Sequence, residues 1–298
     1  MAVYVVPSRP RMLAHCVWIA LLFVALRSAF NAILLPPFRR LVKRRKLGTG
    51  ADKLVEEVYL IFFGLLLVVS SIVITFHAES SRGCNLYTTR SCFSSFAERS
   101  QSSVGAETVW YYLFELGWYL HLLLKGAFGV GRHDGLAMEI HHVVTIALVA
   151  SSFCFGFTKV GMLVFSVFNI STPLLHVSKL CNYLELGRAR VLAFLLFAAA
   201  FTATRIVLLP LKPIRATLYA KSEICQAAGE AFYANELRWT HVFVSAKLSS
   251  LWFLNVYWLE GIARVIRKNV GTRTTRGVVA DDIVGGEEPT GPARPKAA

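Results

Sequence analysis

The chain has 298 residues, of which 55% are hydrophobic and 17% are charged, and it carries a formal net charge of +14. One soluble core of this size cannot bury so much apolar surface, so the composition indicates a membrane protein and excludes an ordinary soluble domain. The excess of basic residues in loops indicates contact with anionic lipid, and no nucleic-acid-binding motif is present.

The apolar residues fall into blocks, each long enough to cross the ~30 Å hydrocarbon layer, which takes roughly 20 residues of helix. No internal repeat is visible. The predicted fold class is therefore all-α, a polytopic membrane helix bundle of about seven transmembrane helices. In chain order the predicted spans are Met12–Leu35, Leu54–Phe76, Val109–Phe128, Met138–Phe157, Val160–Leu180, Val191–Leu211 and His241–Val265.

The orientation follows from the basic residues, because short loops rich in Lys and Arg stay on the cytoplasmic side. A cluster after the first span predicts a lumenal amino terminus, and seven crossings then place the carboxyl terminus in the cytoplasm. We divide the chain into 1–53, the first span and its basic cytoplasmic loop; 54–268, the transmembrane domain; and 269–298, a tail expected to be disordered. The basic cluster consists of Arg39, Arg40, Lys43, Arg44, Arg45 and Lys46.

Two loops lie on the predicted lumenal side. Loop 78–106 has no periodicity and reads as a linker, whereas loop 212–240 is more amphipathic and is expected to lie against the membrane surface. The first loop contains Cys84 and Cys92. These two cysteines could form a disulfide in an oxidising lumen or stay as free thiols, and the sequence leaves both alternatives open. No CxxC pair occurs among the six cysteines, so no cysteine metal site is predicted.

Ionisable residues inside the predicted spans are functional candidates, because a charge at mid-bilayer costs at least roughly 2.5 to 3.5 kcal/mol on insertion scales. The alternative for each is a structural pairing with another helix or an extension to the interface, and for Arg27, His121 and Lys247 we favour it. The full set is Arg27, Glu115, His121, His141, His142, His176, Arg205 and Lys247, with Asn169 and Thr172 as neutral companions.

The adjacent pair His141 and His142 lies about 10 Å into the fourth span if Asp134 caps that helix. Neighbouring positions point about 100° apart, so one imidazole can face the bundle interior while the other turns toward a neighbouring helix. A metal ion prefers histidines four residues apart on one face, so no metal site is predicted. Acid–base or nucleophilic chemistry is the functional interpretation, and interhelical hydrogen bonding is the structural one.

A second polar stripe occurs in the fifth span, where Asn169, Thr172 and His176 are spaced i, i+3 and i+7 on one face. Pro173 lacks an amide donor and therefore leaves the carbonyl of Asn169 without its helical partner. A kink beside a polar stripe indicates a lined cavity, since unsatisfied backbone in lipid must be served by protein or water. A kink that serves packing alone is the other interpretation.

A series of motifs between Trp110 and Arg267 resembles the TLC-domain membrane proteins, and among them the ceramide synthases most. The order and spacing match without a gap from Asp134 to Tyr183. The matching residues are Tyr111-Tyr112-Leu113-Phe114-Glu115-Leu116, Arg132-His133-Asp134, Met138, His141-His142-Val143-Val144-Thr145, Lys159-Val160-Gly161-Met162-Leu163-Val164, Lys179, Asn182-Tyr183, Thr204-Arg205 and Tyr257-Trp258.

This resemblance implies a multi-pass endoplasmic-reticulum protein of sphingolipid metabolism that N-acylates a long-chain base with acyl-CoA. A histidine of the pair would act as a base or as an acyl-accepting nucleophile, so the implied catalytic residues are His141 and His142. The implied partners are membrane lipids, the long-chain base and acyl-CoA as co-substrate, with no bound cofactor, and a homodimer is an open expectation. The residues expected to line the substrate or lipid cavity are Asn169, Thr172, His176, Glu115 and Arg205.

The chain departs from ceramide synthases in one element. They carry His-Asp-x-x-Asp in the span after the histidine pair, and this chain has Phe168-Asn169-Ile170-Ser171-Thr172 there. Asn and Thr form hydrogen bonds but supply no charge, which leaves Glu115, Asp134 or Glu139 as carboxylates that could orient an imidazole. Two functions therefore stay open: an N-acyltransferase, and a non-catalytic TLC protein that binds, senses or moves lipid.

Overall fold

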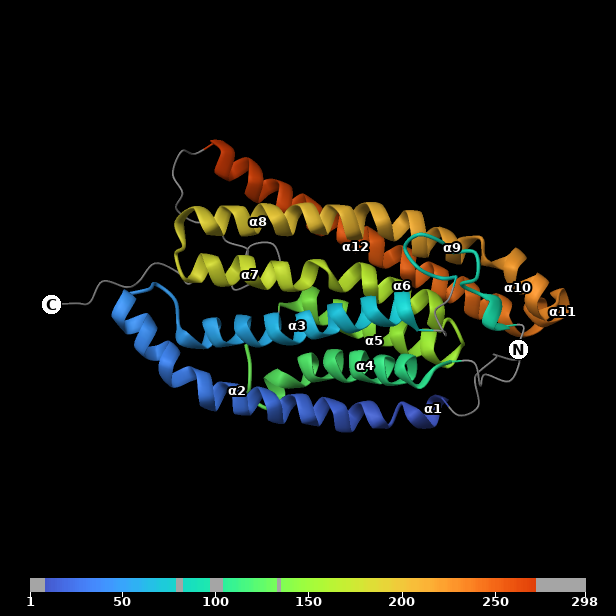
Figure 1. The fold of residues 1–298 in the computed structure, drawn as a ribbon, viewed down its shortest axis with the longest axis horizontal. Helices are drawn as coiled ribbons and strands as arrows, with labels where there is room; N and C mark the ends of the chain where they lie inside the picture. The colour runs from blue at the N-terminus through green and yellow to red at the C-terminus, as the bar shows by residue number, and fades with distance from the viewer. Residues whose placement is uncertain (1–8, 79–82, 97–103, 133–134, 272–298) are drawn as a thin grey trace.

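The computed structural model describes residues 9–78, 83–96, 104–132 and 135–271, and this part of the chain contains helices and no strand (Figure 1). The π-helical turns are η3, η4 and η5, and η2 is a 3-10 turn. The elements are α1 (Arg9–Met12), α2 (His15–Arg45), α3 (Ala51–His77), η2 (Ser94–Phe96), α4 (Ala106–Ala127), α5 (Leu136–Cys154), α6 (Thr158–Asn169), α7 (Ser171–Tyr183), α8 (Gly187–Phe201), η3 (Thr202–Leu208), η4 (Pro210–Ile214), α9 (Arg215–Leu218), α10 (Ala220–Ala228), α11 (Glu230–Phe232), η5 (Tyr233–Leu237) and α12 (Arg238–Gly271).

Each predicted span coincides with helical structure, so the predicted all-α polytopic bundle is confirmed. α5 supplies a shorter apolar helix, Met138–Cys154, and α4 occupies the third predicted span with the charged residues Glu115 and Lys125 inside it. Five helical runs are long and apolar enough to cross a membrane by length and composition: Pro10–Arg45, Ala51–His77, Thr158–Tyr183, Gly187–Leu218 and Glu230–Arg267.

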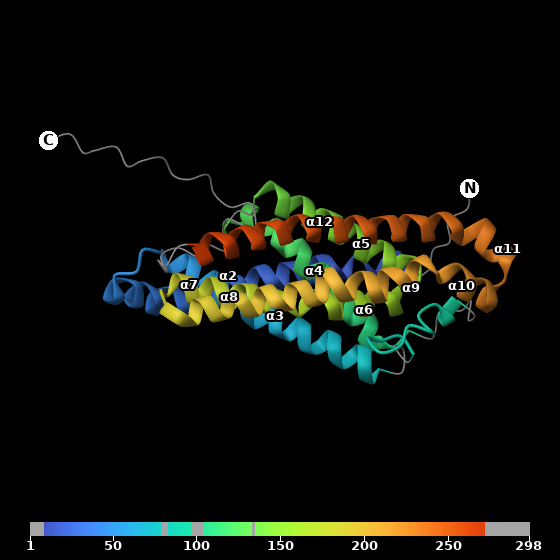
Figure 2. The same cartoon turned by 90° about the horizontal axis from the view of Figure 1, so that it is seen from above.

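The long helices run side by side along the long axis of the molecule (Figures 1 and 2). α2 packs on α3 and α4, α3 on α6 and α7, and α7 on α8, while α5 contacts α4, α6 and α12. The start of α1 and the end of α12 lie at opposite ends of the bundle, as an odd number of crossings requires. The end that carries the α2–α3 and α7–α8 connections also carries the basic last turn of α2. Which membrane face this end meets stays a prediction.

The connection between α4 and α5 stops short of the bundle end that the α2–α3 and α7–α8 connections form, in both views (Figures 1 and 2). α4 and α5 have 22 and 19 residues, whereas α2 and α3 have 31 and 27. The first turns of α5 are therefore set back into the bundle. The capping residue also differs from the predicted one: Gly135 precedes α5 in an extended conformation without a side-chain cap, and Asp134 lies outside the described residues.

The predicted kink in the fifth span coincides with an interruption of the helix at Ile170, which keeps right-handed helical angles. α6 ends at Asn169 and α7 begins at Ser171, with Ile170 between them. Pro173 then falls in the first turn of α7, where a missing amide donor costs little. It lies against Gly64 of α3, where an added Cβ would be 3.6 Å from the Pro173 Cβ.

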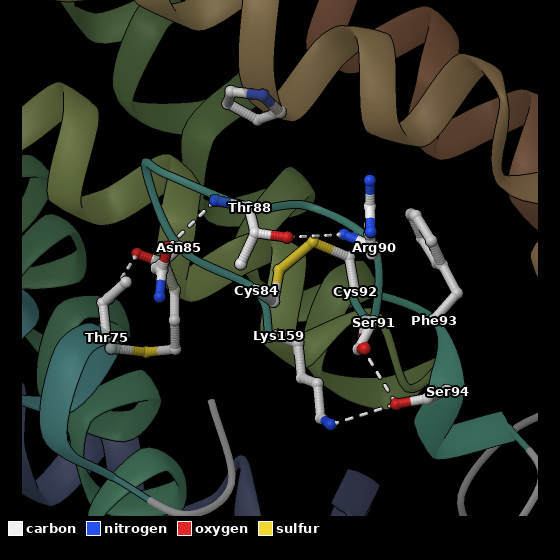
Figure 3. Close-up of a disulfide and its surroundings, with 12 residues drawn as sticks. Thr75, Cys84, Asn85, Thr88, Arg90, Ser91, Cys92, Phe93, Ser94 and Lys159 are labelled. Carbon is white, nitrogen blue, oxygen red and sulfur yellow. Dashed lines mark hydrogen bonds between the residues drawn. A yellow bond between two sulfur atoms is a disulfide. The ribbon is translucent and has the colours of Figure 1, made fainter. Parts of the chain in front are cut away.

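Loop 78–106 is more ordered than a linker over its described residues 83–96. Cys84 and Cys92 form a disulfide, so the disulfide alternative is confirmed (Figure 3). Both cysteines and Phe93 are buried. The Phe93 amide donates to Glu223 Oε1 on α10 at 3.0 Å, and Lys159 Nζ donates to Ser94 Oγ at 3.2 Å. The loop therefore packs on the helices of segment 212–240, whose contact with a membrane surface stays a prediction.

Replacing both bridged cysteines by serine is expected to lower the free energy of unfolding by about 2.5 kcal/mol, because the bond closes a loop with a sequence separation of 8. Chemical unfolding of the purified protein in detergent micelles measures the change. The matched control is Cys225→Ser, since Cys225 is a free cysteine that packs against the same hydrophobic cluster as Cys84 and Cys92. Equal unfolding free energies for the double variant and the control would contradict the prediction.

Candidate functional site

A fully buried carboxylate lies at the centre of α4. Glu115 Oε1 accepts a hydrogen bond from Asn169 Nδ2 at 2.5 Å and one from the Tyr111 hydroxyl at 2.5 Å. Glu115 Oε2 is buried and has no hydrogen-bond partner among the described residues. Asn169 is therefore held by the acidic side chain of a neighbouring helix, and Glu115 keeps one oxygen that a ligand can use.

Thr172, on the other side of the helix break, contacts a cation. Arg205 of η3 donates from Nη2 to Thr172 Oγ1 and to the Phe168 carbonyl, each at 2.9 Å. The guanidinium carbon also lies 4.8 Å from the centroid of the Phe168 ring. Asn169 and Thr172 thus have different partners: Asn169 contacts an acid, and Thr172 contacts a base.

The histidine pair on α5 is buried, with 7% of His141 and 5% of His142 exposed. The ring of His141 lies 5.1 Å from the ring of Trp258 on α12, whereas the ring of His142 lies 5.8 Å from that of Tyr119 on α4. The two imidazoles therefore turn toward different helices, as adjacent helical positions predict. His141 Nδ1 is buried without a hydrogen-bond partner in the described part of the chain.

Electrostatic interactions relate these groups to one another. Arg205 lies within charge–charge range of His141 and of Tyr119, and Tyr119 lies within the same range of Glu115. α4, α5 and the α6–η3 region thus contribute polar groups to one interior region. A cavity bounded by these residues stays a prediction.

His176, the third residue of the predicted stripe, has a different neighbour. Its Nδ1 lies 2.7 Å from Glu57 Oε2, and the Glu57 side chain is only 3% exposed. The three residues of the stripe therefore contact three different elements: Asn169 contacts α4, Thr172 contacts η3, and His176 contacts α3. Glu139, named from the sequence as a carboxylate that could orient an imidazole, is exposed on α5.

A buried ion cluster holds the α4–α5 connection. Arg27 of α2 pairs with Glu56 Oε1 of α3 at 2.6 Å, and Lys125 of α4 lies 3.3 Å from the same oxygen. Arg27 Nε and Asn31 Nδ2 donate to the carbonyl of Val130 at 3.0 and 2.9 Å. The structural interpretation of Arg27 is therefore confirmed, and the cluster fixes the backbone that leads into the histidine helix.

The other two structural candidates also have local contacts. His121 Nδ1 lies 2.5 Å from the Trp118 carbonyl, and its ring stacks on Phe23 with centroids 5.2 Å apart. Lys247 Nζ lies 3.9 Å above the centre of the Phe243 ring. These contacts agree with packing roles for both residues.

Sequence reasoning missed Glu56 and Glu57 as partners of the cations. The signal was present, since two adjacent acids fall inside the second predicted span, and buried charges need counter-charges. It also missed Tyr119, which packs on His142 from α4. Tyr119 lies four residues after Glu115, so it shares the inward face of α4.

Comparison with known proteins identifies the family of this chain. The family model of the TLC domain matches residues 53–264, which is well over half of the chain. The chain belongs to the TLC-domain family. The match contains the histidine pair, Glu115, the α6–α7 break and Arg205, whereas α2 with Arg27 lies outside it.

Curated relatives of this TLC-domain protein include ceramide synthases, so the predicted resemblance is confirmed. Human ceramide synthase 5 is 31% identical over 172 residues, covering 58% of this chain and 40% of the relative. Human ceramide synthase 4 is 32% identical over 157 residues, covering 53% and 37%. Alternaria stem canker resistance protein 1 of Solanum lycopersicum is 27% identical over 173 residues, covering 58% and 54%. The chain thus aligns with about half or less of the length of these relatives.

Proposed function

We propose that this TLC-domain protein acts in sphingolipid metabolism in the endoplasmic-reticulum membrane and transfers an acyl group from acyl-CoA to the amino group of a long-chain base. The observation that carries the proposal is the buried pair His141 and His142, in a family that contains ceramide synthases. Imidazole exchanges protons near neutral pH and is also a nucleophile. The unpartnered Nδ1 of His141 is the atom we assign to the reaction.

The proposed reaction forms an amide. The amine nitrogen attacks the thioester carbonyl, a C–N bond forms, and the C–S bond breaks. As a general base, the histidine takes the proton from the amine and returns it to the departing thiolate. As a nucleophile, the neutral imidazole first accepts the acyl group, and its N–H proton passes to the departing thiolate. The amine then displaces the imidazole, which takes up the proton of the amine.

Glu115 supports the same proposal from α4. Its free Oε2 is a hydrogen-bond acceptor for a substrate amino group, while Asn169 and Tyr111 hold Oε1. We assign Glu115, Asn169, Thr172, His176 and Arg205 to the substrate or lipid region. The same proposal includes a lumenal amino terminus and a cytoplasmic carboxyl terminus.

A second candidate function is non-catalytic binding, sensing or movement of lipid. The observation in its favour is that Asn169 and Thr172 replace the two aspartates and are already engaged with Glu115 and Arg205. A site without those carboxylates can still hold a lipid headgroup by hydrogen bonds.

The test is expression of the full chain in membranes that lack their own ceramide synthase, with a labelled long-chain base and acyl-CoA. The enzyme proposal expects N-acylated product. The control is the double variant His141→Ala, His142→Ala, expressed to the same level. Equal product from both would overturn the enzyme proposal and favour the lipid-binding function.

Restoring both carboxylates separates the two functions further. The variant Asn169→Asp, Thr172→Asp is expected to form product at a rate within about tenfold of the natural chain if Glu115 already serves as the acid of the site. The matched control is Asn169→Gln, Thr172→Asn, which changes size without adding charge. Product from the restored variant alone would mean that the natural chain is not this enzyme.

A further inference from the structure

Arg205 is a half-buried cation near the middle of its membrane helix. It is the nineteenth residue of the 32-residue run Gly187–Leu218, so it lies about 27 Å from the start of the run and about 20 Å from its end. An arginine keeps its charge in proteins, and a charge at this depth is costly without compensation. The groups that contact Arg205 therefore indicate which kind of ligand the site can bind.

The partners of Arg205 are neutral. Nη2 donates to the Thr172 hydroxyl and the Phe168 carbonyl, and the guanidinium lies over the rings of Phe168 and Phe201 at 4.8 and 5.4 Å. Nε is buried without a hydrogen-bond partner, and no carboxylate in the described ranges lies within ion-pair distance. The guanidinium is therefore held in place while its charge stays uncompensated.

Two fully buried cations of the same bundle, in contrast, have a counter-charge. Arg27 and Lys125 both share Glu56 at 2.6 and 3.3 Å. The missing acid at Arg205 is thus a local feature of the α6–η3 region. Arg205 is also in the centre of η3, and π-helical turns are rare and often occur at functional sites.

We infer that Arg205 binds an oxyanion at the head of an acyl chain, the carboxylate of a fatty acid or the phosphate of a lipid. The inference rests on the proposed lipid-handling function and names the ligand class of its site. A planar guanidinium suits such oxygens, because it can donate two parallel hydrogen bonds to them. Thr172 and Phe168 fix one edge of the guanidinium, and Nε supplies a further donor. His141 of α5 is within charge–charge range of Arg205.

The test measures ligand-induced stabilisation of the purified full chain in neutral detergent micelles. Oleate, phosphatidic acid and oleyl alcohol are added at equal mole fraction in the micelle, so that the oleate and alcohol arms differ in the head group alone. We expect oleate, phosphatidic acid or both to raise the unfolding temperature and oleyl alcohol to leave it unchanged. The arm that responds identifies the source of the oxyanion. An equal response to oleyl alcohol, or no response to either anion, would overturn the inference.

Two variants at one position test the role of Arg205 without removing it. Thr172→Asp places a carboxylate where the hydroxyl now accepts from Arg205 at 2.9 Å, and Thr172→Asn is its uncharged counterpart of similar shape. We expect the aspartate variant to bind the anion at least about tenfold more weakly than the asparagine variant and to unfold at a higher temperature without ligand. Equal affinities of the two variants would contradict the inference.

Further variants distinguish this inference from the proposed reaction. Arg205→Gln should also lose anion binding, whereas Arg188→Gln, which alters an exposed arginine at the start of α8, should retain it. The variant His141→Ala, His142→Ala should bind the anion within about threefold of the natural chain, because recognition lies with Arg205. Loss of binding in the histidine variant alone would assign the anion to the histidines and overturn the inference, whatever the outcome of the acyl-transfer assay.

Discussion

Membranes that contain the His141→Ala variant are expected to form N-acylated product about 10²–10⁴-fold more slowly than membranes with the natural chain. The reason is that a positioned general acid or base contributes roughly this factor, and alanine has no proton acceptor. His141 is buried, and its Nδ1 is unpaired in the described structure. Initial rates with labelled long-chain base, normalised to the amount of protein, measure the effect.

His142→Ala is expected to slow the reaction as well, and the double variant should be little slower than the slower single variant if the two histidines act as one unit. The matched control is His77→Ala, because His77 is an exposed histidine at the end of α3, far along the chain from the pair. A His141→Ala rate equal to that of the His77→Ala control would remove His141 from the mechanism.

The substitution Glu56→Gln is expected to lower the free energy of unfolding by about 3–5 kcal/mol. Removing one partner of a buried ion pair leaves an uncompensated charge, and Glu56 is the shared partner of Arg27 and Lys125. The Glu56 side chain is 9% exposed and that of Arg27 is 2% exposed, so solvent screens the pair little. Chemical unfolding in detergent micelles measures the loss.

Glu260→Gln is the matched control for this second prediction. Glu260 and Arg264 form an ion pair four residues apart on α12 at 3.9 Å, with both side chains more than three-fifths exposed. Its loss should cost under about 0.5 kcal/mol, because water screens an exposed pair. Similar losses for the two variants would show that the buried cluster contributes no more than a surface pair.

The Glu56 variant should also reduce acyl transfer. Glu56 Oε2 accepts from the Arg132 amide at 3.0 Å, and Arg27 and Asn31 hold the Val130 carbonyl. These contacts fix the connection that enters α5 five residues before His141. α2, which lies outside the family match, thus helps to hold the backbone that leads into α5, the helix of the histidine pair.

The sequence by itself determined the helical architecture of this protein. Apolar blocks of about 20 residues can satisfy their backbone groups in lipid only as helices, so their helical structure and their order follow from local composition. The break before Pro173 was equally local, because a proline lacks an amide wherever it falls. The different directions of the His141 and His142 rings followed from helical geometry alone.

The tertiary structure decided which side chains contact one another. Asn169 meets Glu115 from 54 positions away, and Arg205 reaches Thr172 across 33 positions. Periodicity places a residue on a helix face, but the neighbour of that face depends on how the helices pack. For the same reason the sequence left the Cys84–Cys92 pairing open and did not predict that Glu56 would join Arg27 to Lys125. The uncompensated charge of Arg205 also became visible only with the fold, because the absence of a counter-charge is a property of its surroundings in space.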